Sequence, residues 1–402
     1  MSSTKIASKV TEIEVGMPPF DAVRLDRLMS ERGLDAVLVT SKHNIQYLLG
    51  GYRYFFYSYM DAHGLSRYLP IFIYVRDRAD LAAYVASPME TFEQELNKFW
   101  VGEVLPNNMT SPEYAATAVA YLRRIAHAKG RIGVEVGFMP IDAHRVLSEG
   151  LPDAELVDAT FALELMRAVK SPTELDILKM ASEKVVDSML AVFSSHGPGS
   201  TKMEIVNALR NEQRKRDLHF EYCLSTIGIK FNRAPSAQMW QSGEILSLDS
   251  GGNYRGYIGD LCRMAFPGAP DSELEDLLGE VEEIQQTARQ PIRAGALGRE
   301  VYAATEPLLA RSSYRSCLDF VAHGMGIVSH EAPWLTDKAS VPYQAYHADR
   351  PLEAGMVLSI ETTLKHPVRG FVKLEDTVVA TEDGYEAFGD GGRGWNAAGT
   401  GS

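Results

Sequence analysis

The chain has 402 residues, of which 45% are hydrophobic and 23% are charged, and its formal net charge is −13. This length predicts two domains, and the excess of acidic residues disfavours nucleic acid as a partner. The sequence contains neither an apolar run of about 18 residues nor a signal-like start, so we expect no membrane span and no secretion. Three cysteines without CxxC spacing, Cys223, Cys262 and Cys317, fit reduced thiols in a cytoplasmic protein.

The first part of the chain alternates amphipathic helical segments with short β-rich runs, which is the pattern of an α/β domain. Helices are predicted over residues 20–34 and 111–130, where apolar residues recur at helical spacing. Strands are predicted at residues 35–41, 68–77, 80–86 and 130–137. We therefore expect an N-terminal domain over residues 1–165 that contains a mixed sheet flanked by helices.

A second domain is predicted to begin near "MRAVKSPTELDILKMA". Ser171, Pro172 and Glu174 form the sequence signature of a capping box with proline at the first helical position. Further helices are predicted at residues 271–292 and 298–314, and strands at residues 356–364 and 371–389. We expect an α+β domain over residues 166–390, followed by a loose tail over residues 391–402.

The stretch "DSGGNYRGYIGD" carries an aspartate at each end of a glycine-rich bend. Asp249 and Asp260 are eleven positions apart, so a hairpin with an even-length loop is expected to place them directly opposite each other on one face. Directly paired Cβ atoms lie roughly 4.5 to 5.5 Å apart, where like charges destabilise a sheet. Either one acid is protonated, or a cation lies between them, or one acid points to solvent beside a polar turn.

Three more potential metal ligands stand in strand-like runs downstream: His323 in "FVAHGMG", Glu361 in "MVLSIETTL" and Glu375 in "FVKLEDTVVA". Taken singly, such a histidine is a hydrogen-bonded core residue and such a glutamate lies on the wet face of a sheet. Both glutamates have apolar neighbours, however, and burial of an unpaired glutamate costs several kcal/mol. Four carboxylates and one imidazole suit two divalent ions about 3.5 to 4 Å apart, which can hold a bridging hydroxide as a nucleophile.

The ordered set "LDSGGNYRGYIGD", "HGMGIVSHEAP", "GMVLSIE" and "FVKLEDTVV" resembles the metal-binding pattern of the pita-bread family. This family contains prolidase, aminopeptidase P, methionine aminopeptidase and creatinase. The segments "MRAVKSPTELDILKMA" and "TSKHNIQYLLG" are similar to the prolidase and creatinase branch. The resemblance extends over nearly the whole chain and implies a C-terminal pita-bread catalytic domain behind an N-terminal creatinase-type α/β domain.

The resemblance also implies roles for individual residues. It implies that Asp249, Asp260 and Glu375 bridge or chelate two divalent ions and that His323 and Glu361 complete the site. Manganese is the expected ion, with Zn²⁺, Co²⁺ or Fe²⁺ as alternatives. Glu361 is expected to act as the base that deprotonates the nucleophilic water and passes the proton to the leaving nitrogen. His330 is expected to bind the tetrahedral intermediate or a substrate carboxylate.

Two positions depart from the pattern of the family's peptidases. Asn232 stands where those peptidases have a histidine, and asparagine cannot deliver a proton to a leaving amine. Asp319 stands four residues before the metal histidine, where creatinase-branch peptidases often carry another histidine. Asn232 and Arg233 remain candidates for substrate binding, and Arg233 could pair with a substrate carboxylate.

Together these features predict a dinuclear metal-dependent hydrolase that cleaves a C–N amide bond, with Xaa-Pro peptides as the first substrate class. The alternative is a hydrolase or lyase of a small non-peptide molecule, of the ectoine hydrolase or creatinase type. A non-catalytic binding module is a third reading, although such relatives typically lose metal ligands. We expect a small-molecule or short-peptide substrate and a homodimer, in which the aromatic segment 50–70 either contributes to the substrate pocket or is buried as a hydrophobic patch.

Overall fold

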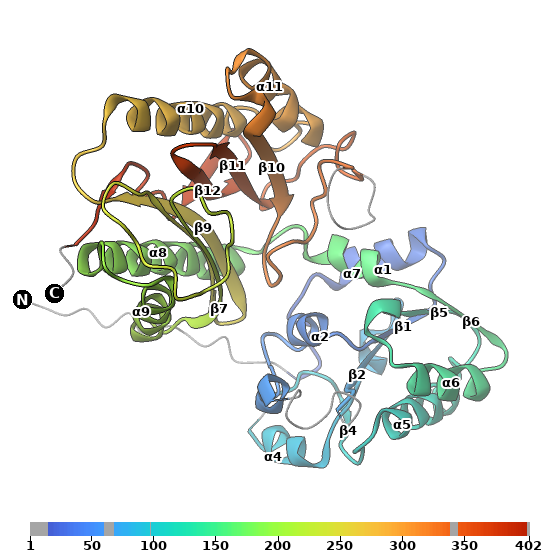
Figure 1. Cartoon of the computed structure of the whole chain (residues 1–402). Coiled ribbons are helices and arrows are strands. Elements are labelled where there is room, and N and C mark those ends of the chain that lie inside the picture. The colour runs from blue at the N-terminus through green and yellow to red at the C-terminus, as the bar shows by residue number, and fades with distance from the viewer. Residues whose placement is uncertain (1–14, 60–67, 97, 338–344, 400–402) are drawn as a thin grey trace, which may run out of the picture. The chain divides into compact units, whose positions relative to one another are not determined.

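The computed structural model describes residues 15–59, 68–96, 98–337 and 345–399. The chain forms two compact units, residues 1–166 and residues 167–402 (Figure 1). Each unit contains its own sheet. Only the second unit carries the residues that the sequence singles out as metal ligands.

The N-terminal unit contains a six-stranded mixed sheet with the strand order β4-β3-β2-β1-β5-β6. Its strands are β1 (Ala36–Val39), β2 (Ile71–Val75), β3 (Ala83–Val85), β4 (Glu103–Leu105), β5 (Gly130–Val134) and β6 (Ala154–Asp158). Its helices are α1 (Ala22–Glu31), α2 (Lys42–Leu48), α4 (Thr91–Gln94), α5 (Ser111–Arg124) and α6 (Ile141–Gly150), with α7 (Thr160–Arg167) at its end. The central strand β1 is antiparallel to β2 and parallel to β5, so the sheet is mixed, as predicted. The predicted aromatic segment 50–70 falls partly outside the described residues.

The C-terminal unit contains an eight-stranded sheet whose main path has the order β10-β11-β12-β9-β8-β7. Its strands are β7 (His219–Ile227), β8 (Leu246–Tyr254), β9 (Tyr257–Phe266), β10 (Leu318–Gly324), β11 (Val357–His366), β12 (Gly370–Ala380), β13 (Tyr385–Phe388) and β14 (Asn396–Ala397). Its helices are α8 (Pro172–Ser195), α9 (Lys202–Lys215), α10 (Ser272–Arg289) and α11 (Gly298–Arg311). Figure 1 shows α8 and α9 beside β7 to β9, and α10 and α11 beside β10 to β12.

The entry into α8 follows from the predicted capping box. The Ser171 side chain accepts from the backbone N–H of Glu174, and the Glu174 carboxylate accepts from the backbone N–H of Ser171 at 2.8 Å. Helix α8 then lies directly against β9, because a Cβ atom on Gly259 would come within 2.7 Å of the Ala181 backbone. The absence of a side chain at Gly259 therefore sets how closely the helix supports the strand that carries Asp260.

The hairpin of β8 and β9 corrects one prediction. Its two turn residues are Arg255 and Gly256, which have positive φ angles of 52° and 95°, as tight two-residue hairpin turns require. In the resulting register Asp249 pairs with Cys262, whereas Asp260 pairs with Gly251. The two aspartates share a face but are diagonal neighbours, so the prediction that they are directly opposite is wrong. The turn lies one residue further along the chain than direct pairing requires.

The prediction of a loose tail over residues 391–402 is wrong for residues 391–399. Strand β14 pairs in parallel with the end of β9. The Trp395 indole N–H donates to the backbone oxygen of Leu274 at 3.0 Å, and the Arg393 guanidinium lies 2.5 Å from Asp376. These anchors outweigh the glycine-rich composition on which the prediction rested. Residues 400–402 lie outside the described residues.

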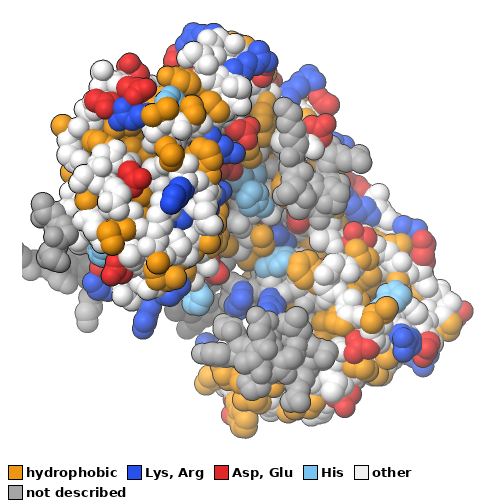
Figure 2. Space-filling model, in the orientation of Figure 1, with side chains coloured by type: hydrophobic (Ala, Val, Ile, Leu, Met, Phe, Trp, Pro, Cys, Tyr) orange, Lys and Arg blue, Asp and Glu red, His pale blue; other side chains and the backbone are white. Residues whose placement is uncertain are grey.

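The outer surface carries charges of both signs. On the face shown in Figure 2, basic side chains are interspersed with acidic ones. In the described part of the chain, no helix is both long enough and apolar enough to cross a lipid bilayer.

Candidate metal centre

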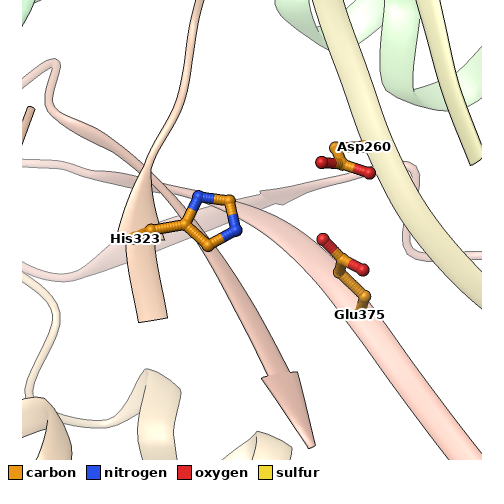
Figure 3. Close-up of side chains that lie close together, drawn as sticks. All are labelled: Asp260, His323 and Glu375. Atoms are coloured by element: carbon orange, nitrogen blue, oxygen red, sulfur yellow. The ribbon is translucent and has the colours of Figure 1, made fainter. Parts of the chain in front are cut away.

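The five predicted metal ligands come together in the C-terminal sheet, one from each of the strands β8 to β12. Ligand atoms of Asp260, His323 and Glu375 all lie within 4.8 Å of one another, and so do those of Asp249, Glu361 and Glu375. We call the first set the histidine half-site and the second set the carboxylate half-site, and Glu375 belongs to both. Figure 3 shows the histidine half-site, where the carboxylates of Asp260 and Glu375 face each other and the His323 ring is directed toward them.

Strand register accounts for this convergence. Glu361 pairs directly with Glu375 across β11 and β12, and Glu361 also pairs with Val321 of β10. Glu375 in turn pairs with Cys262 of β9, the residue that pairs with Asp249 of β8. Two directly opposed glutamates repel each other, so this arrangement requires a cation at the same face.

The histidine half-site leaves buried polar atoms without a partner. Asp260 Oδ1 and His323 Nε2 are both buried, and neither has a hydrogen-bond partner among the described residues. A buried polar atom without a partner costs roughly 1–3 kcal/mol. His323 Nδ1 lies 3.1 Å from the backbone oxygen of Gly324, so a proton on Nδ1 leaves the Nε2 lone pair directed into the site. This half-site has the donor set and the unused valences that a divalent cation needs.

Electrostatics in the histidine half-site point the same way. Burial is the largest cause that raises the pKa of Asp260 well above its ordinary value, and the negative charges of Glu375 and Asp249 raise it further. Without a cation, this carboxyl group therefore resists ionisation. A divalent ion bound between Asp260 and Glu375 would remove the repulsion and satisfy both unpartnered atoms.

The carboxylate half-site contains a residue that our sequence reasoning missed, Lys373. Its Nζ atom lies 2.6 Å from Asp249 Oδ2 and 2.8 Å from Glu375 Oε2, and it also contacts Glu361 Oε2. Burial alone lowers the pKa of Lys373, but the surrounding Asp249, Glu375 and Glu361 raise it well above its ordinary value. The signal was present in "FVKLED", because residues two apart on a strand share a face and Lys373 is two residues before Glu375.

A second cation reaches the same half-site from outside the sheet. The Arg233 guanidinium contacts Asp249 Oδ2, the oxygen that also faces Lys373. Burial raises the pKa of Asp249, and the opposing effect of Lys373 and Arg233 moderates the rise. The predicted substrate-binding candidate Arg233 thus lies at the site, where it is paired with Asp249.

His330 lies beside the histidine half-site. Its ring stacks on that of His323 with a centroid distance of 3.7 Å and an interplanar angle of 13°. Partial burial of the ring is the largest cause that lowers the pKa of His330, and the nearby His323 and Lys373 lower it further, to about 4. The imidazole is therefore neutral near pH 7, although the residue as a whole keeps contact with solvent.

The segment that carries His330 is anchored by its neighbour Glu331. The Glu331 carboxylate is buried and accepts from Arg167 at 2.9 Å and from Lys170 at 3.0 Å. Its backbone N–H donates to the oxygen of Gly324, one residue after His323. These contacts fix the spacing between the two histidine rings. They also give the "MRAVK" segment a structural role, because it supplies both cations.

The two departures from the family pattern lie at the edge of the site. Asn232 is exposed, and its side-chain oxygen accepts from the backbone N–H of Ala234 at 2.9 Å, so it forms a local turn. Asp319 is exposed on β10, four residues before His323. Neither residue belongs to the two groups of potential ligands.

The opposite face of β12 carries another acid that our sequence reasoning did not single out. Asp376 is buried and accepts from the Gln285 amide at 2.7 Å. Its oxygens also lie 3.2 Å from Arg263, 3.1 Å from Arg289 and 2.5 Å from Arg393. Burial raises the pKa of Asp376, but the three guanidinium groups outweigh this effect and hold it far below the ordinary value.

Comparison with known proteins identifies the family. Residues 176–382 match metallopeptidase family M24, and residues 23–169 match the creatinase/prolidase N-terminal domain. The chain belongs to metallopeptidase family M24. The predicted family, fold class and hydrolase class are therefore confirmed. Membership of an M24 metallopeptidase family also implies divalent metal ions as cofactors.

Individual relatives of this M24 chain extend over most of its length. The uncharacterized peptidase YqhT of Bacillus subtilis is 26% identical over 368 residues, which cover 90% of this chain and 95% of that protein. An Xaa-Pro dipeptidase of Lactobacillus delbrueckii subsp. lactis is 21% identical and covers 91% of this chain and 95% of its own length. The structure of an Xaa-Pro dipeptidase from Bacillus anthracis has a TM-score of 0.78 at 22% identity, covering 92% of this chain and 96% of its own, and so shares the fold.

Proposed function

We propose that this M24 chain is a metal-dependent hydrolase that cleaves the C–N amide bond of a small substrate, with Xaa-Pro peptides as the first class to test. The observation that carries the proposal is the pair of buried, unpartnered atoms, Asp260 Oδ1 and His323 Nε2, beside Glu375. The Xaa-Pro dipeptidase relatives support the substrate class. Two ions, manganese as the metal, a homodimer and a cytoplasmic location remain predictions.

The residues present fit a divalent cation. Asp260, His323 and Glu375 would hold it with two carboxylates and one imidazole, a donor set that suits Mn²⁺, Fe²⁺, Co²⁺ or Zn²⁺. When bound, such an ion polarises a carbonyl group and lowers the pKa of a water molecule.

Glu361 is the residue best suited to move a proton. Its side chain is 17% exposed, whereas those of Asp249 and Glu375 are 4% and 3% exposed. Its Oε1 atom lies 3.8 Å from His323 Nε2. We propose that Glu361 accepts a proton from the attacking water and delivers it to the leaving nitrogen.

His330 would bind the carbonyl oxygen as negative charge develops on it. The pKa of about 4 keeps His330 neutral in the physiological range. A neutral imidazole carries one N–H group, which can donate a hydrogen bond to that oxygen. Its stacking on His323 holds the ring beside the histidine half-site. Arg233 is a weaker candidate for substrate binding, because it already contacts Asp249.

One observation favours a second candidate function. The Asn232 side chain is engaged in a local turn and has no titratable group, so it offers no proton to a leaving amine. A small cyclic amide or amidine, whose leaving nitrogen makes different demands on a proton donor, is therefore the alternative substrate class. Asn232→His should change proline-peptide activity more than it changes metal content.

The proposed function is tested by comparing Glu361→Gln with Glu382→Gln. Glu382 is an exposed glutamate just after β12 and serves as the matched control. With Mn²⁺ present, we assay Xaa-Pro dipeptides, longer Xaa-Pro peptides and small cyclic amidines. Glu361→Gln should lower kcat about 100-fold or more, as loss of a general base does, while the control keeps wild-type turnover. Full activity in Glu361→Gln, or turnover that survives chelation of all metal, would overturn the proposal.

A further inference from the structure

The two half-sites differ in a way that bears on how many ions the site takes. In the histidine half-site, Asp260 Oδ1 and His323 Nε2 lack partners in the described part of the chain. In the carboxylate half-site, the ammonium group of Lys373 already contacts Asp249, Glu361 and Glu375. One half-site therefore has free valences, and the other already contains a cation that belongs to the protein.

We propose that this chain binds one divalent ion, in the histidine half-site, and that Lys373 is the permanent cation of the carboxylate half-site. This inference rests on the proposed metal-dependent function, and it replaces the sequence-based expectation of two ions.

The geometry of Lys373 supports this assignment. An ammonium group has three N–H donors, and Lys373 has three carboxylate partners, one on each of β8, β11 and β12. All three ion-pair partners lie within the half-site. The side chain is only 4% exposed, so moving the ammonium group aside would break three ion pairs, one of which is also a hydrogen bond to Asp249, and would bury a charge without a partner.

The charges at the site lead to the same number of ions. The four carboxylates of Asp249, Asp260, Glu361 and Glu375 carry four negative charges when ionised. Lys373 and the Arg233 guanidinium on Asp249 balance two of these charges. The remaining two negative charges equal the charge of one divalent cation. A second divalent ion would add excess positive charge at a buried site, which is unfavourable.

Lys373 would act as a positioning residue. Its contact with Glu361 Oε2 leaves Oε1 as the oxygen nearer to His323 Nε2, at 3.8 Å. The lysine thus holds the proposed base with one oxygen directed toward the histidine half-site.

The test counts ions on the folded full-length chain and does not depend on turnover. Wild-type protein, Lys373→Met, Lys373→Arg and the control Lys365→Met, an exposed lysine on β11, are equilibrated with saturating Mn²⁺. Bound manganese is counted by native mass spectrometry, and electron paramagnetic resonance distinguishes an isolated Mn²⁺ ion from an exchange-coupled pair. We expect one equivalent with an isolated-ion spectrum for the wild type, Lys373→Arg and Lys365→Met, and a second equivalent with a coupled spectrum for Lys373→Met.

Each other result counts against the inference. Two equivalents in the wild type would overturn it and leave the proposed hydrolase intact. One equivalent in both the wild type and Lys373→Met would also overturn it, because the lysine would then not be what excludes a second ion. No bound manganese in the wild type would overturn the proposed function as well. If Lys373→Met does not fold, the wild-type count and spectrum alone still decide between one ion and two.

Discussion

The two faces of β12 bury acids in opposite ways. On one face, Asp376 is surrounded by Arg263, Arg289, Arg393 and Gln285. On the other face, Glu375 shares Lys373 with two further carboxylates, and unpartnered atoms of Asp260 and His323 lie beside it. Glu375 thus belongs to a cluster whose carboxylate and imidazole atoms are incompletely paired. Its neighbour Asp376 has cationic partners on both oxygens, and Arg289 Nε is the buried atom left without a hydrogen-bond partner among the described residues of that cluster. Burial of a charge therefore does not by itself mark a functional site, whereas a group of buried carboxylate and imidazole atoms without partners does.

The largest change in the free energy of unfolding is expected when the charge of Asp376, on the arginine-paired face of β12, is removed. Asp376→Asn leaves the buried Arg263 without its anionic partner and Arg289 with Asp390 alone, and it should lower the free energy of unfolding by about 3–5 kcal/mol. Urea denaturation in the presence of EDTA measures this. Asp390→Asn is the control in the same arginine network, because Asp390 is 43% exposed and its loss should cost less than about 1 kcal/mol. Equal losses in the two variants would contradict the assignment of Asp376 as the anchor.

On the other face of β12, the histidine half-site should be stabilised by a bound metal ion. Mn²⁺ at about 100 times its dissociation constant should raise the free energy of unfolding by about 2.7 kcal/mol. His323→Ala should abolish this increment, whereas Asp390→Asn should retain it. Thermal unfolding with and without Mn²⁺ gives the comparison. An undiminished increment in His323→Ala would mean that the stabilising ion binds elsewhere.

A smaller effect of opposite sign is expected when an acid of the unpaired face is neutralised. Asp260→Asn removes a buried acid beside Glu375 and Asp249, and it should stabilise the metal-free protein by about 1 kcal/mol, as relief of strain at a functional site does. Urea denaturation in EDTA tests this, with the exposed Asp319→Asn as the near-neutral control. If Asp260→Asn were destabilised instead, Asp260 would be an acid that stabilises the fold, as Asp376 is.

The smallest expected effect is a pH dependence of stability at Glu331. Burial raises the pKa of Glu331, but Arg167 and Lys170 outweigh burial and lower it below the ordinary value. Its contribution to stability is therefore present above the unfolded-state pKa of about 4.3 and is lost as the pH falls toward the folded-state pKa. The difference in unfolding free energy between the wild type and Glu331→Gln should shrink between about pH 6 and pH 3. A gap that stays constant over this range would argue that Glu331 acts through shape alone.

The sequence predicted much of the fold and the gathering of the five candidate ligands, because both depend on local patterns. The Ser171 capping box and the polar residues that interrupt apolar strands were legible without coordinates. The register of the β8–β9 hairpin was not, since it depends on which two residues take the turn. A one-residue difference in the turn converted an expected direct pair of aspartates into a diagonal one.

Lys373 shows why the site could be predicted only in part. Its position two residues before Glu375 placed it on the correct face, yet a strand lysine usually carries its charge out to water along its aliphatic stem. Only the three-dimensional convergence of β8, β11 and β12 turns it inward. The Asp376 cluster was missed for a related reason, because its three arginines come from separate segments of the chain.

The inward-pointing Lys373 has a consequence for the competition between metal ions for this site in a cell. A charge tethered to the backbone cannot be chelated, diluted or exchanged for a stronger-binding competitor such as copper or zinc. With Lys373 in place, three of the four acids share a counter-ion in the folded protein before any metal ion binds. Binding of a wrong metal would then be confined to the histidine half-site, because folding alone supplies the cation of the carboxylate half-site.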